Sequence, residues 1–309
     1  MAKNKKAEKL FHEYFKGWIE LYKVNAIRSV TLKKYYMSHQ WVRDLAPDLR
    51  LCDIDRRSYQ KLLNDYATTH ERQTTMDFHH QLKGALLDAM DEGLIEQNPT
   101  RKAIIKGKKP REKKIKYLNQ FEVQSMLNQL VLNDKISWDW FILLVTKTGL
   151  RFSEALALTP SDFDFISQKI SVEKTWDYKS IVGCFQLTKN ESSKRKIQLD
   201  WQIAMQFSQL TKELPDDEPI FVRGRVFNST VNNRLQILCE KANIPIITIH
   251  GLRHTHASLL LFAGVSIASV ARRLGHSSMS TTQETYLHII HELENQDNEK
   301  IMRHLSMLI

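Results

Sequence analysis

Cysteine is scarce in this 309-residue chain, which has only three, and none of them stands in a CxxC pattern. Cys52, Cys184 and Cys239 lie far apart, so the sequence predicts neither a disulfide framework nor a zinc site. Long apolar runs are also missing: no stretch approaches the roughly 20 residues that span a bilayer, and residues 1–9 are charged, unlike a signal peptide. We therefore expect a cytoplasmic protein without membrane segments.

Patterns that bind nucleotides or metals are missing as well. The chain has no GxxxxGK(S/T) loop, no EF-hand pattern and no dense cluster of carboxylates of the kind that holds catalytic magnesium. We therefore expect chemistry that needs no cofactor and no metal.

Positive charge is plentiful and unevenly distributed. The chain carries a net charge of +10, and residues 101–116 hold nine basic residues against one acidic residue. Such a dense block is typical of a solvated linker, and it also attracts the phosphates of nucleic acids with a strong dependence on salt. The candidate phosphate contacts are Lys106, Lys108, Lys109, Arg111, Lys113 and Lys114, together with Lys194 further along.

The first hundred residues predict a small all-helical domain. Apolar residues recur there at three-and-four spacing. The predicted helices cover residues 7–23, 29–45, 55–70 and 74–92. Asn98-Pro99 ends the pattern, and the basic run with Gly107 and Pro110 is typical of an interdomain linker. We therefore divide the chain into a helical domain (1–100), a linker (101–116) and a second domain (117–309).

The second domain combines helices with a few short strands. Helical patterns cover residues 119–130 and 137–148, and Gly149 suits the end of the second helix. Strand patterns follow at residues 169–172, 181–187 and 196–199, with a polar turn at 190–193. The rest is helical again. The predicted fold class is mainly α with a small antiparallel β-sheet that contains a hairpin.

Four local patterns in this second domain carry candidate chemistry. They are Thr148-Gly149-Leu150-Arg151 followed by Glu154, then Lys189, then His250-Gly251-Leu252-Arg253-His254-Thr255, and finally Leu274-Gly275-His276 with Tyr286 ten residues after the histidine. Together they resemble, in order and spacing, the signature of the tyrosine recombinase (phage-type integrase) family. The resemblance spans about residues 117–300 and implies a preceding helical core-type DNA-binding domain.

Elementary chemistry supports this reading of the two arginines. Transfer of a phosphodiester builds negative charge on its nonbridging oxygens, which a site without metal must offset with fixed cations and hydrogen bonds. A guanidinium binds two phosphate oxygens and does not titrate, so Arg151 and Arg253 are the expected clamp. Glu154 lies three residues after Arg151 and can orient it on one helix face.

Tyr286 is the candidate nucleophile, and we expect it to be exposed. Residues 281–284 match a capping box, so we expect a helix to start there and to carry the tyrosine in its second turn. A free phenol has a pKa near 10, so attack requires a base or a strongly cationic pocket, and the arginines and histidines would supply that pocket.

The family resemblance implies the remaining roles. It assigns proton donation to the leaving 5′-oxygen to a hairpin lysine, here Lys189, with Lys194 and Lys196 across the same turn as alternatives. It also implies that His250 assists proton transfer with the nucleophile and that His276 hydrogen-bonds the phosphate. The broken bond would be stored as a 3′-phosphotyrosine, so rejoining needs no ATP.

The resemblance also implies partners: double-stranded DNA, a homo-tetramer in the synaptic complex, and host DNA-bending or excision factors. Residues 291–309 keep a helical apolar pattern that could pack on the same chain or on a neighbour. Integration or excision of a mobile element is the expected activity. The alternatives are a chromosome-dimer recombinase, a type IB topoisomerase, and a regulator without cleavage activity, since residues 257–274 imitate a helix-turn-helix.

Overall fold

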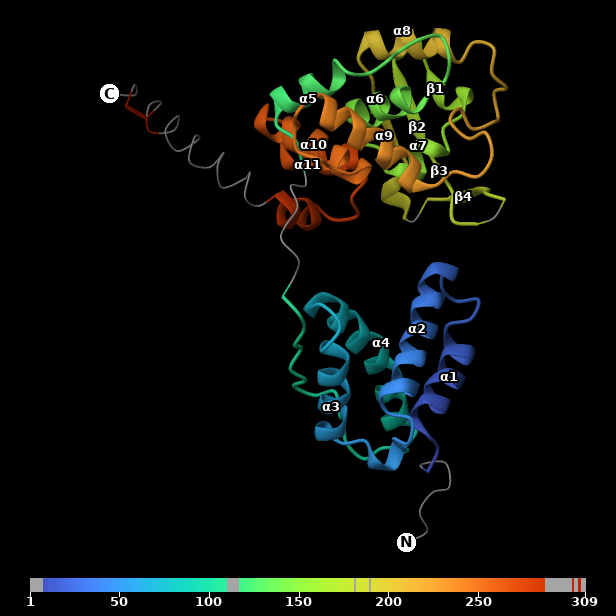
Figure 1. Ribbon diagram of the computed structural model, residues 1–309, viewed down its shortest axis with the longest axis vertical. Coiled ribbons are helices and arrows are strands. Elements are labelled where there is room, and N and C mark those ends of the chain that lie inside the picture. The colour runs from blue at the N-terminus through green and yellow to red at the C-terminus, as the bar shows by residue number, and fades with distance from the viewer. Residues whose placement is uncertain are drawn as a thin grey trace. The chain divides into compact units, whose positions relative to one another are not determined.

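The computed structural model describes residues 8–109, 117–180, 182–188 and 190–286, together with 302, 305 and 306. The chain divides into two compact units, Met1–Lys113 and Lys114–Ile309 (Figure 1). Each unit has its own apolar core. In the described part of the chain, no helix combines the length and the apolar character needed to cross a membrane.

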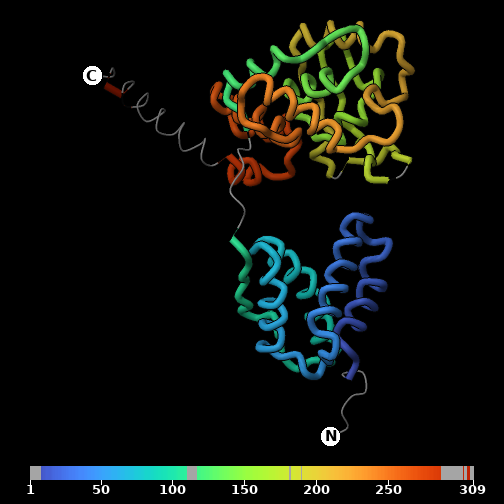
Figure 2. The backbone as a smooth tube through the Cα atoms, in the orientation of Figure 1, coloured from blue at the N-terminus to red at the C-terminus, as the bar shows by residue number. Residues whose placement is uncertain are grey.

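Within residues 8–109, the described part of the first unit, the chain forms four helices and a short 3-10 turn (Figure 2). They are α1 (Phe11–Tyr22), α2 (Ser29–Leu45), η1 (Leu51–Asp53), α3 (Arg56–Ala67) and α4 (Arg72–Asp91). The three-and-four spacing in α1 places Phe11, Phe15 and Ile19 on its buried face, where they meet Leu82 and Leu86 of α4 in one core. The Asp55 side chain accepts hydrogen bonds from the first backbone amides of α3 and so fixes where that helix begins.

The described part of the basic segment, residues 101–109, packs along this first unit. The Gln60 side chain donates to the Ile104 carbonyl at 2.8 Å and accepts from its amide at 2.9 Å. Further on, the Lys108 amide donates to the His70 carbonyl at 2.8 Å. Lys106, Lys108 and Lys109 are exposed here, whereas Arg111, Lys113 and Lys114 lie outside the described residues. The backbone of this segment is therefore held while the three described lysines face solvent.

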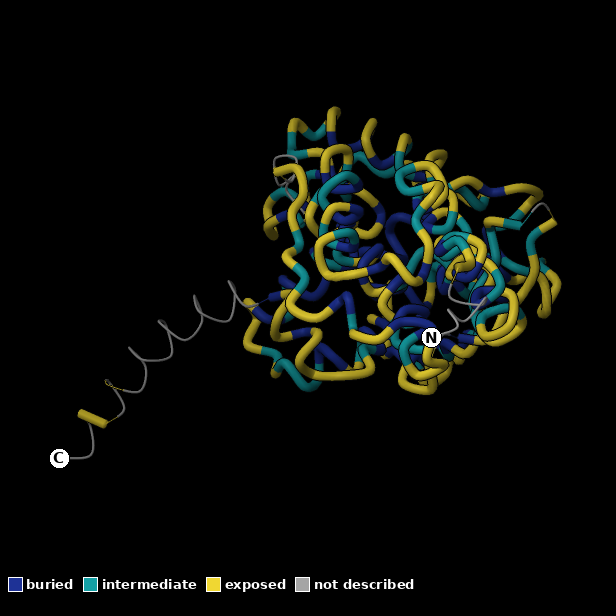
Figure 3. The backbone as a smooth tube through the Cα atoms, turned by 90° about the horizontal axis from the view of Figure 1, so that it is seen from below, coloured by how far each residue is buried: buried dark blue, intermediate teal, exposed yellow. Residues whose placement is uncertain are grey.

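The second unit is mainly helical. Its helices are α5 (Gln120–Leu127), α6 (Trp138–Thr148), α7 (Phe152–Leu156), α8 (Trp201–Leu210), α9 (Asn228–Lys241), α10 (Ile249–Phe262) and α11 (Ile267–Leu274), with 3-10 turns η2 (Pro160–Asp162) and η3 (Glu191–Ser193), and residues 279–286 are helical as well. Helix α6 is buried along most of its length and packs against α10. Gly149 ends α6 with φ +68°, a left-handed conformation that suits glycine. Figure 3 shows buried positions alternating with exposed ones along the helices.

The described residues of this unit form two small antiparallel sheets, where the sequence predicts one. Strands β1 (Phe163–Asp164), β2 (Lys169–Val172) and β5 (Arg195–Gln198) form the first, with Ile170 opposite Ile197. Strands β3 (Lys174–Trp176) and β4 (Phe185–Leu187) form the second. The hairpin that the turn at 190–193 predicts, between residues 181–187 and 196–199, is wrong, because β4 pairs with β3. The three residues of β3 are all half-buried, so they carry no alternating pattern that would reveal a strand.

Candidate active site

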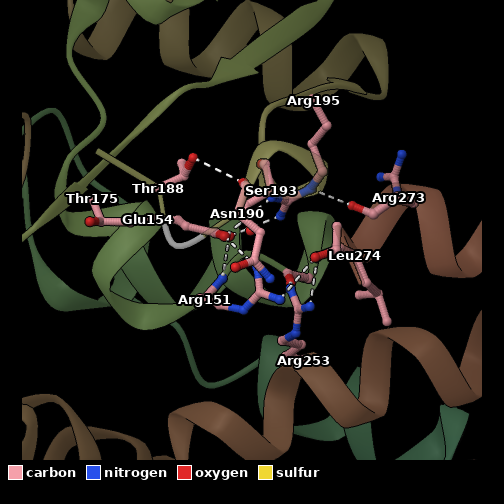
Figure 4. Close-up of polar contacts among 12 residues, drawn as sticks. Arg151, Glu154, Thr175, Thr188, Asn190, Ser193, Arg195, Arg253, Arg273 and Leu274 are labelled. Atoms are coloured by element: carbon pink, nitrogen blue, oxygen red, sulfur yellow. Dashed lines mark hydrogen bonds and ion pairs between the residues drawn. The ribbon is translucent and has the colours of Figure 1, made fainter. Parts of the chain in front are cut away.

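The end of helix α11 gathers three arginines from distant parts of the second unit. The carbonyl oxygens of residues 273–275 each accept a hydrogen bond from a different guanidinium (Figure 4). Arg195 Nε donates to the first at 2.7 Å, Arg253 Nη2 to the second at 2.6 Å and Arg151 Nη2 to the third at 3.0 Å. The last carbonyls of a helix lack partners within the helix and carry partial negative charge, so they favour cations.

Arg253 is buried, with only 3% of its surface exposed. It comes from α10, and its Nη1 also donates to the carbonyl of Gly149, the cap of α6, at 2.7 Å. Burial, and after it the neighbouring charge of Arg151, lowers the pKa of Arg253 to about 9. A pKa of about 9 still leaves the guanidinium charged at neutral pH.

Arg151 stands between the Gly149 cap and helix α7, where Glu154 holds it. Its amide donates to Glu154 Oε2 at 2.9 Å and its Nη1 to Oε1 at 2.7 Å. Glu154 is 1% exposed and also receives Arg195 Nη2 at 2.9 Å. Burial alone would raise the pKa of Glu154, but the hydrogen bonds and charge of Arg195, with the charge of Arg151, outweigh it and lower the pKa to about 2. Arg151 and Arg195 thus share one carboxylate, and Arg253 interacts electrostatically with the same group, so the cluster carries a surplus of positive charge.

Tyr286 is buried, with 2% of its surface exposed, so the expectation of an exposed tyrosine is wrong. Its ring packs with apolar side chains of α10 and α11, among them Leu261, Val270 and Leu274. Its hydroxyl lies 3.0 Å from His254 Nδ1. Burial raises the pKa of Tyr286 to about 12, although the positive charge of Arg253 opposes the rise. In this arrangement the phenol is held protonated and apart from solvent.

The helix that carries Tyr286 begins at residue 279, two residues before the predicted start. Ser278 Oγ accepts a hydrogen bond from the Ser280 amide at 3.1 Å, so a serine just before the helix performs the capping that the sequence assigns to residues 281–284. The side chain of Thr282, in turn, lies 2.7 Å from His276 Nδ1. This contact ties the loop after α11 to the helix of Tyr286.

Three histidines, His250, His254 and His276, lie close to Tyr286 or to the arginines. Burial, together with the charges of Arg253 and Arg151, lowers the pKa of His276 to about 4, so His276 is neutral at physiological pH. The His250 ring lies edge-on to the His254 ring, with 4.8 Å between centroids. The sequence assigns no chemistry to His254, but the structure places it between His250 and the Tyr286 hydroxyl.

The matching family model carries the description "Phage integrase family" and covers residues 116–292, more than half of the chain. The chain belongs to the phage integrase family. The protein is a tyrosine-type site-specific recombinase, and the predicted family and fold class are confirmed.

Three similar proteins illustrate this relationship. The integrase of Staphylococcus phage L54a is 25% identical over 325 residues, which cover 94% of this chain and 92% of that protein. Among solved structures, the Tn1549 transposon integrase in complex with transposon right end DNA has a TM-score of 0.74 at 19% identity, covering 90% of this chain and 95% of that one. A lambda integrase tetramer bound to a Holliday junction has a TM-score of 0.64 at 19% identity, covering 89% and 80%. These two structures show the fold.

Of the three candidate lysines of this recombinase, the structure describes two. Lys189 follows β4 and lies outside the described residues. Lys194 is exposed and forms an ion pair with Glu191 at 2.9 Å, and Lys196 is exposed on β5. Within the described ranges, no group of three or more His, Cys, Asp or Glu side chains is arranged to hold a metal ion.

Arg195 is, besides His254, a site residue that sequence reasoning missed. A single arginine in a basic stretch is expected to be solvated, yet this side chain is only 6% exposed. One signal could have revealed it: side chains alternate along a strand, so Arg195 lies on the same face of β5 as the buried Ile197.

Proposed function

We propose that this recombinase integrates and excises a mobile element by cutting and rejoining duplex DNA, with Tyr286 as the nucleophile. The observation that carries the proposal is the gathering of Arg151 and Arg253 at the end of α11, directly before the loop of His276 and the helix of Tyr286. Fixed guanidinium groups with a surplus of positive charge are suited to a phosphodiester whose oxygens gain charge during transfer.

The proposed reaction exchanges one phosphate ester for another. The phenolic oxygen of Tyr286 attacks the phosphorus and its proton passes toward the histidines, for which His250 is our candidate. The bond to the 5′-oxygen breaks as that oxygen takes a proton, for which Lys189 is our candidate donor. His276, neutral at physiological pH, can donate a hydrogen bond to the phosphate. Because the 3′-phosphotyrosine keeps the ester, attack by a 5′-hydroxyl reverses the steps without ATP.

Tyr286 must leave its packed position before this attack, and we place that movement in residues 279–286. Its hydroxyl is bonded to His254, and its buried ring makes the phenol a weaker acid than free tyrosine. A phosphate bound to Arg151 and Arg253 would compete for the guanidinium donors that now bind the carbonyls of residues 274 and 275. We infer that DNA bound in this way draws the Tyr286 side chain toward these two arginines.

DNA contacts and assembly form the remaining parts of the proposal. The three exposed lysines Lys106, Lys108 and Lys109 sit on a backbone that the first unit holds in place, which suits contact with DNA phosphates. Arg111, Lys113, Lys114 and Lys194 complete the proposed set. A tetramer on two duplexes is proposed because lambda integrase has been solved as a tetramer on a Holliday junction. Residues 291–309, the proposed connector, lie almost entirely outside the described residues. With DNA as its substrate, we place the protein in the cytoplasm.

The alternative, a regulator without cleavage activity, accounts for fewer of the contacts described above. Helices α10 and α11 do form a helix-turn-helix-like pair, with Gly264 at φ +82° in the turn. However, the same two helices surround Tyr286 and supply Arg253 and the three acceptor carbonyls. Integration is also favoured over resolution of chromosome dimers, because the phage relative that matches 94% of the chain is an integrase.

Covalent trapping tests the proposal. The protein is incubated with DNA that spans the junctions of its mobile element and is nicked so that cleavage cannot reverse, and a denaturing gel reveals the covalent complex. Tyr286→Phe is expected to abolish the complex and to leave DNA binding nearly intact, because only the phenolic oxygen is removed. Tyr178→Phe, a loss of hydroxyl elsewhere in the unit, is the matched control and should still form it. A covalent complex with Tyr286→Phe would show that the nucleophile is another residue.

A further inference from the structure

We propose that Arg195 is a positioning residue that fixes Arg151 through Glu154 and connects it to the loop of His276. The inference rests on the proposed function, because it assigns Arg195 to the assembly of the same site. Arg195 Nη2 and Nη1 donate to the two oxygens of Glu154 at 2.9 and 3.2 Å. The same carboxylate receives Arg151, so the position of one arginine depends on the other.

The remaining donors of Arg195 bind two backbone segments that flank the site. Its Nε donates to the carbonyl of Arg273 at 2.7 Å, in the last turn of α11. Its Nη1 donates to the carbonyl of Ser193 at 2.9 Å, in the turn between β4 and β5. Among the described residues, Arg253 binds only backbone carbonyls, whereas Arg195, whose side chain is 6% exposed, also binds both oxygens of a buried carboxylate that already neutralises its charge. Its role is therefore to hold other groups in place.

The backbone beside Arg195 provides an independent observation. Gly275 precedes His276 and has φ +67°, a backbone conformation that residues with a side chain rarely adopt. A Cβ at this position would lie 2.9 Å from Arg195 Nη1 and 3.1 Å from the Ser192 carbonyl. The turn that leads to His276 thus packs directly against the Arg195 guanidinium and leaves no room for a side chain.

Loss of Arg195 should change how the site responds to pH. Glu154 is buried, which by itself raises its pKa, and Arg195 contributes the largest opposing effect. Without Arg195 the pKa of Glu154 moves upward, so the carboxylate takes up a proton at a higher pH than in the native protein. A protonated Glu154 holds Arg151 less strongly, and cleavage should therefore fall on the acidic side of the pH profile.

Single-turnover cleavage of the nicked DNA, measured across pH alongside DNA binding, tests this role. Arg195→Met is expected to slow formation of the covalent complex by about 10- to 100-fold, as is usual when a supporting partner is lost. Its DNA affinity should stay close to native, and its rate should gain a new decline toward acidic pH. Arg195→Lys should recover part of the rate, because lysine restores a charge beside Glu154. Arg223→Met, which removes an exposed arginine of the same unit, is the matched control.

The double variant Glu154→Gln with Arg195→Met separates the proposed role from a general loss of packing. It should lack the new acidic decline, because the titrating group is gone. Native rates in both Arg195 variants, or a decline that survives in the double variant, would overturn the proposal. A loss of DNA affinity equal to the loss of rate would also overturn it, by showing a direct contact with DNA. If Arg195→Met does not fold, the rate and pH profile of Arg195→Lys decide the matter. A native protein that forms no Tyr286-dependent complex would instead contradict the proposed function.

Discussion

Replacing Glu154 by glutamine measures how much the buried carboxylate contributes to folding. Its pKa is about 2, against an ordinary value of 4.5. A difference of one in pKa corresponds to about 1.36 kcal/mol, so the ionised form stabilises the fold by about 3 kcal/mol at neutral pH. Loss of one partner from a buried ion pair costs about 3–5 kcal/mol, because the other charge remains buried. The two routes agree, and we expect Glu154→Gln to lower the free energy of unfolding by about 3–4 kcal/mol.

The lowered pKa of Glu154 determines how this loss of stability changes with pH. Because folding lowers the pKa of Glu154, its contribution is complete above pH 4.5 and is lost as the pH falls from 4.5 toward 2. The difference in unfolding free energy between the native protein and Glu154→Gln should therefore be largest at neutral pH and should shrink below pH 4.5.

Urea unfolding followed by circular dichroism at neutral pH, and in steps between pH 5 and pH 3, measures this difference. Glu213→Gln, which changes an exposed carboxylate of the same unit, is the control and should stay within about 0.5 kcal/mol of the native protein. The reasoning fails if Glu154→Gln unfolds like the control, or if its deficit stays constant as the pH falls.

Two further substitutions test the surroundings of the site. Gly275→Ala forces a side chain into a left-handed backbone and against Arg195, so the free energy of unfolding should fall by about 1–3 kcal/mol. Gly17→Ala, in open space on α1, should be neutral or stabilising, and equal effects of the two changes would contradict the reasoning. His254→Phe keeps a ring but removes the partner of the Tyr286 hydroxyl, so hydrogen exchange at residues 279–286 should be faster, by a factor on the order of 10. Unchanged exchange would show that the hydrogen bond does not hold the helix.

Local signals in the sequence were sufficient to predict where most helices lie. Helix α2 spans Ser29–Leu45 as predicted, and Gly149 ends α6 in the left-handed conformation that its position suggests. These features depend on apolar periodicity and on backbone freedom within a few residues, both of which the sequence displays. The motif order also sufficed for the family, and the expectation that Glu154 orients Arg151 is confirmed by two hydrogen bonds.

Features that depend on distant contacts could not be predicted in this way. The partner of β4 is β3, and this strand of three residues is too short to show an alternation of apolar and polar residues. The burial of Tyr286 depends on apolar side chains of α10 and α11, and a tyrosine on an amphipathic helix can face either way. Arg195 is recognisable as a site residue only when Glu154 and the end of α11 are seen beside it. The catalytic roles stay predictions for all six residues: Arg151, Lys189, His250, Arg253, His276 and Tyr286.

The three carbonyls at the end of α11 make the assembly of the arginine cluster a property of the complete second unit. Arg151, Arg195 and Arg253 come from widely separated parts of the sequence, and the carbonyls that gather them come after all three. A growing polypeptide that has not yet reached α11 already holds all three arginines and Glu154, but it lacks the row of carbonyls that binds all three guanidinium groups. The cluster is therefore completed only after α11 has been synthesised, and an unfinished chain carries the charge without the arrangement.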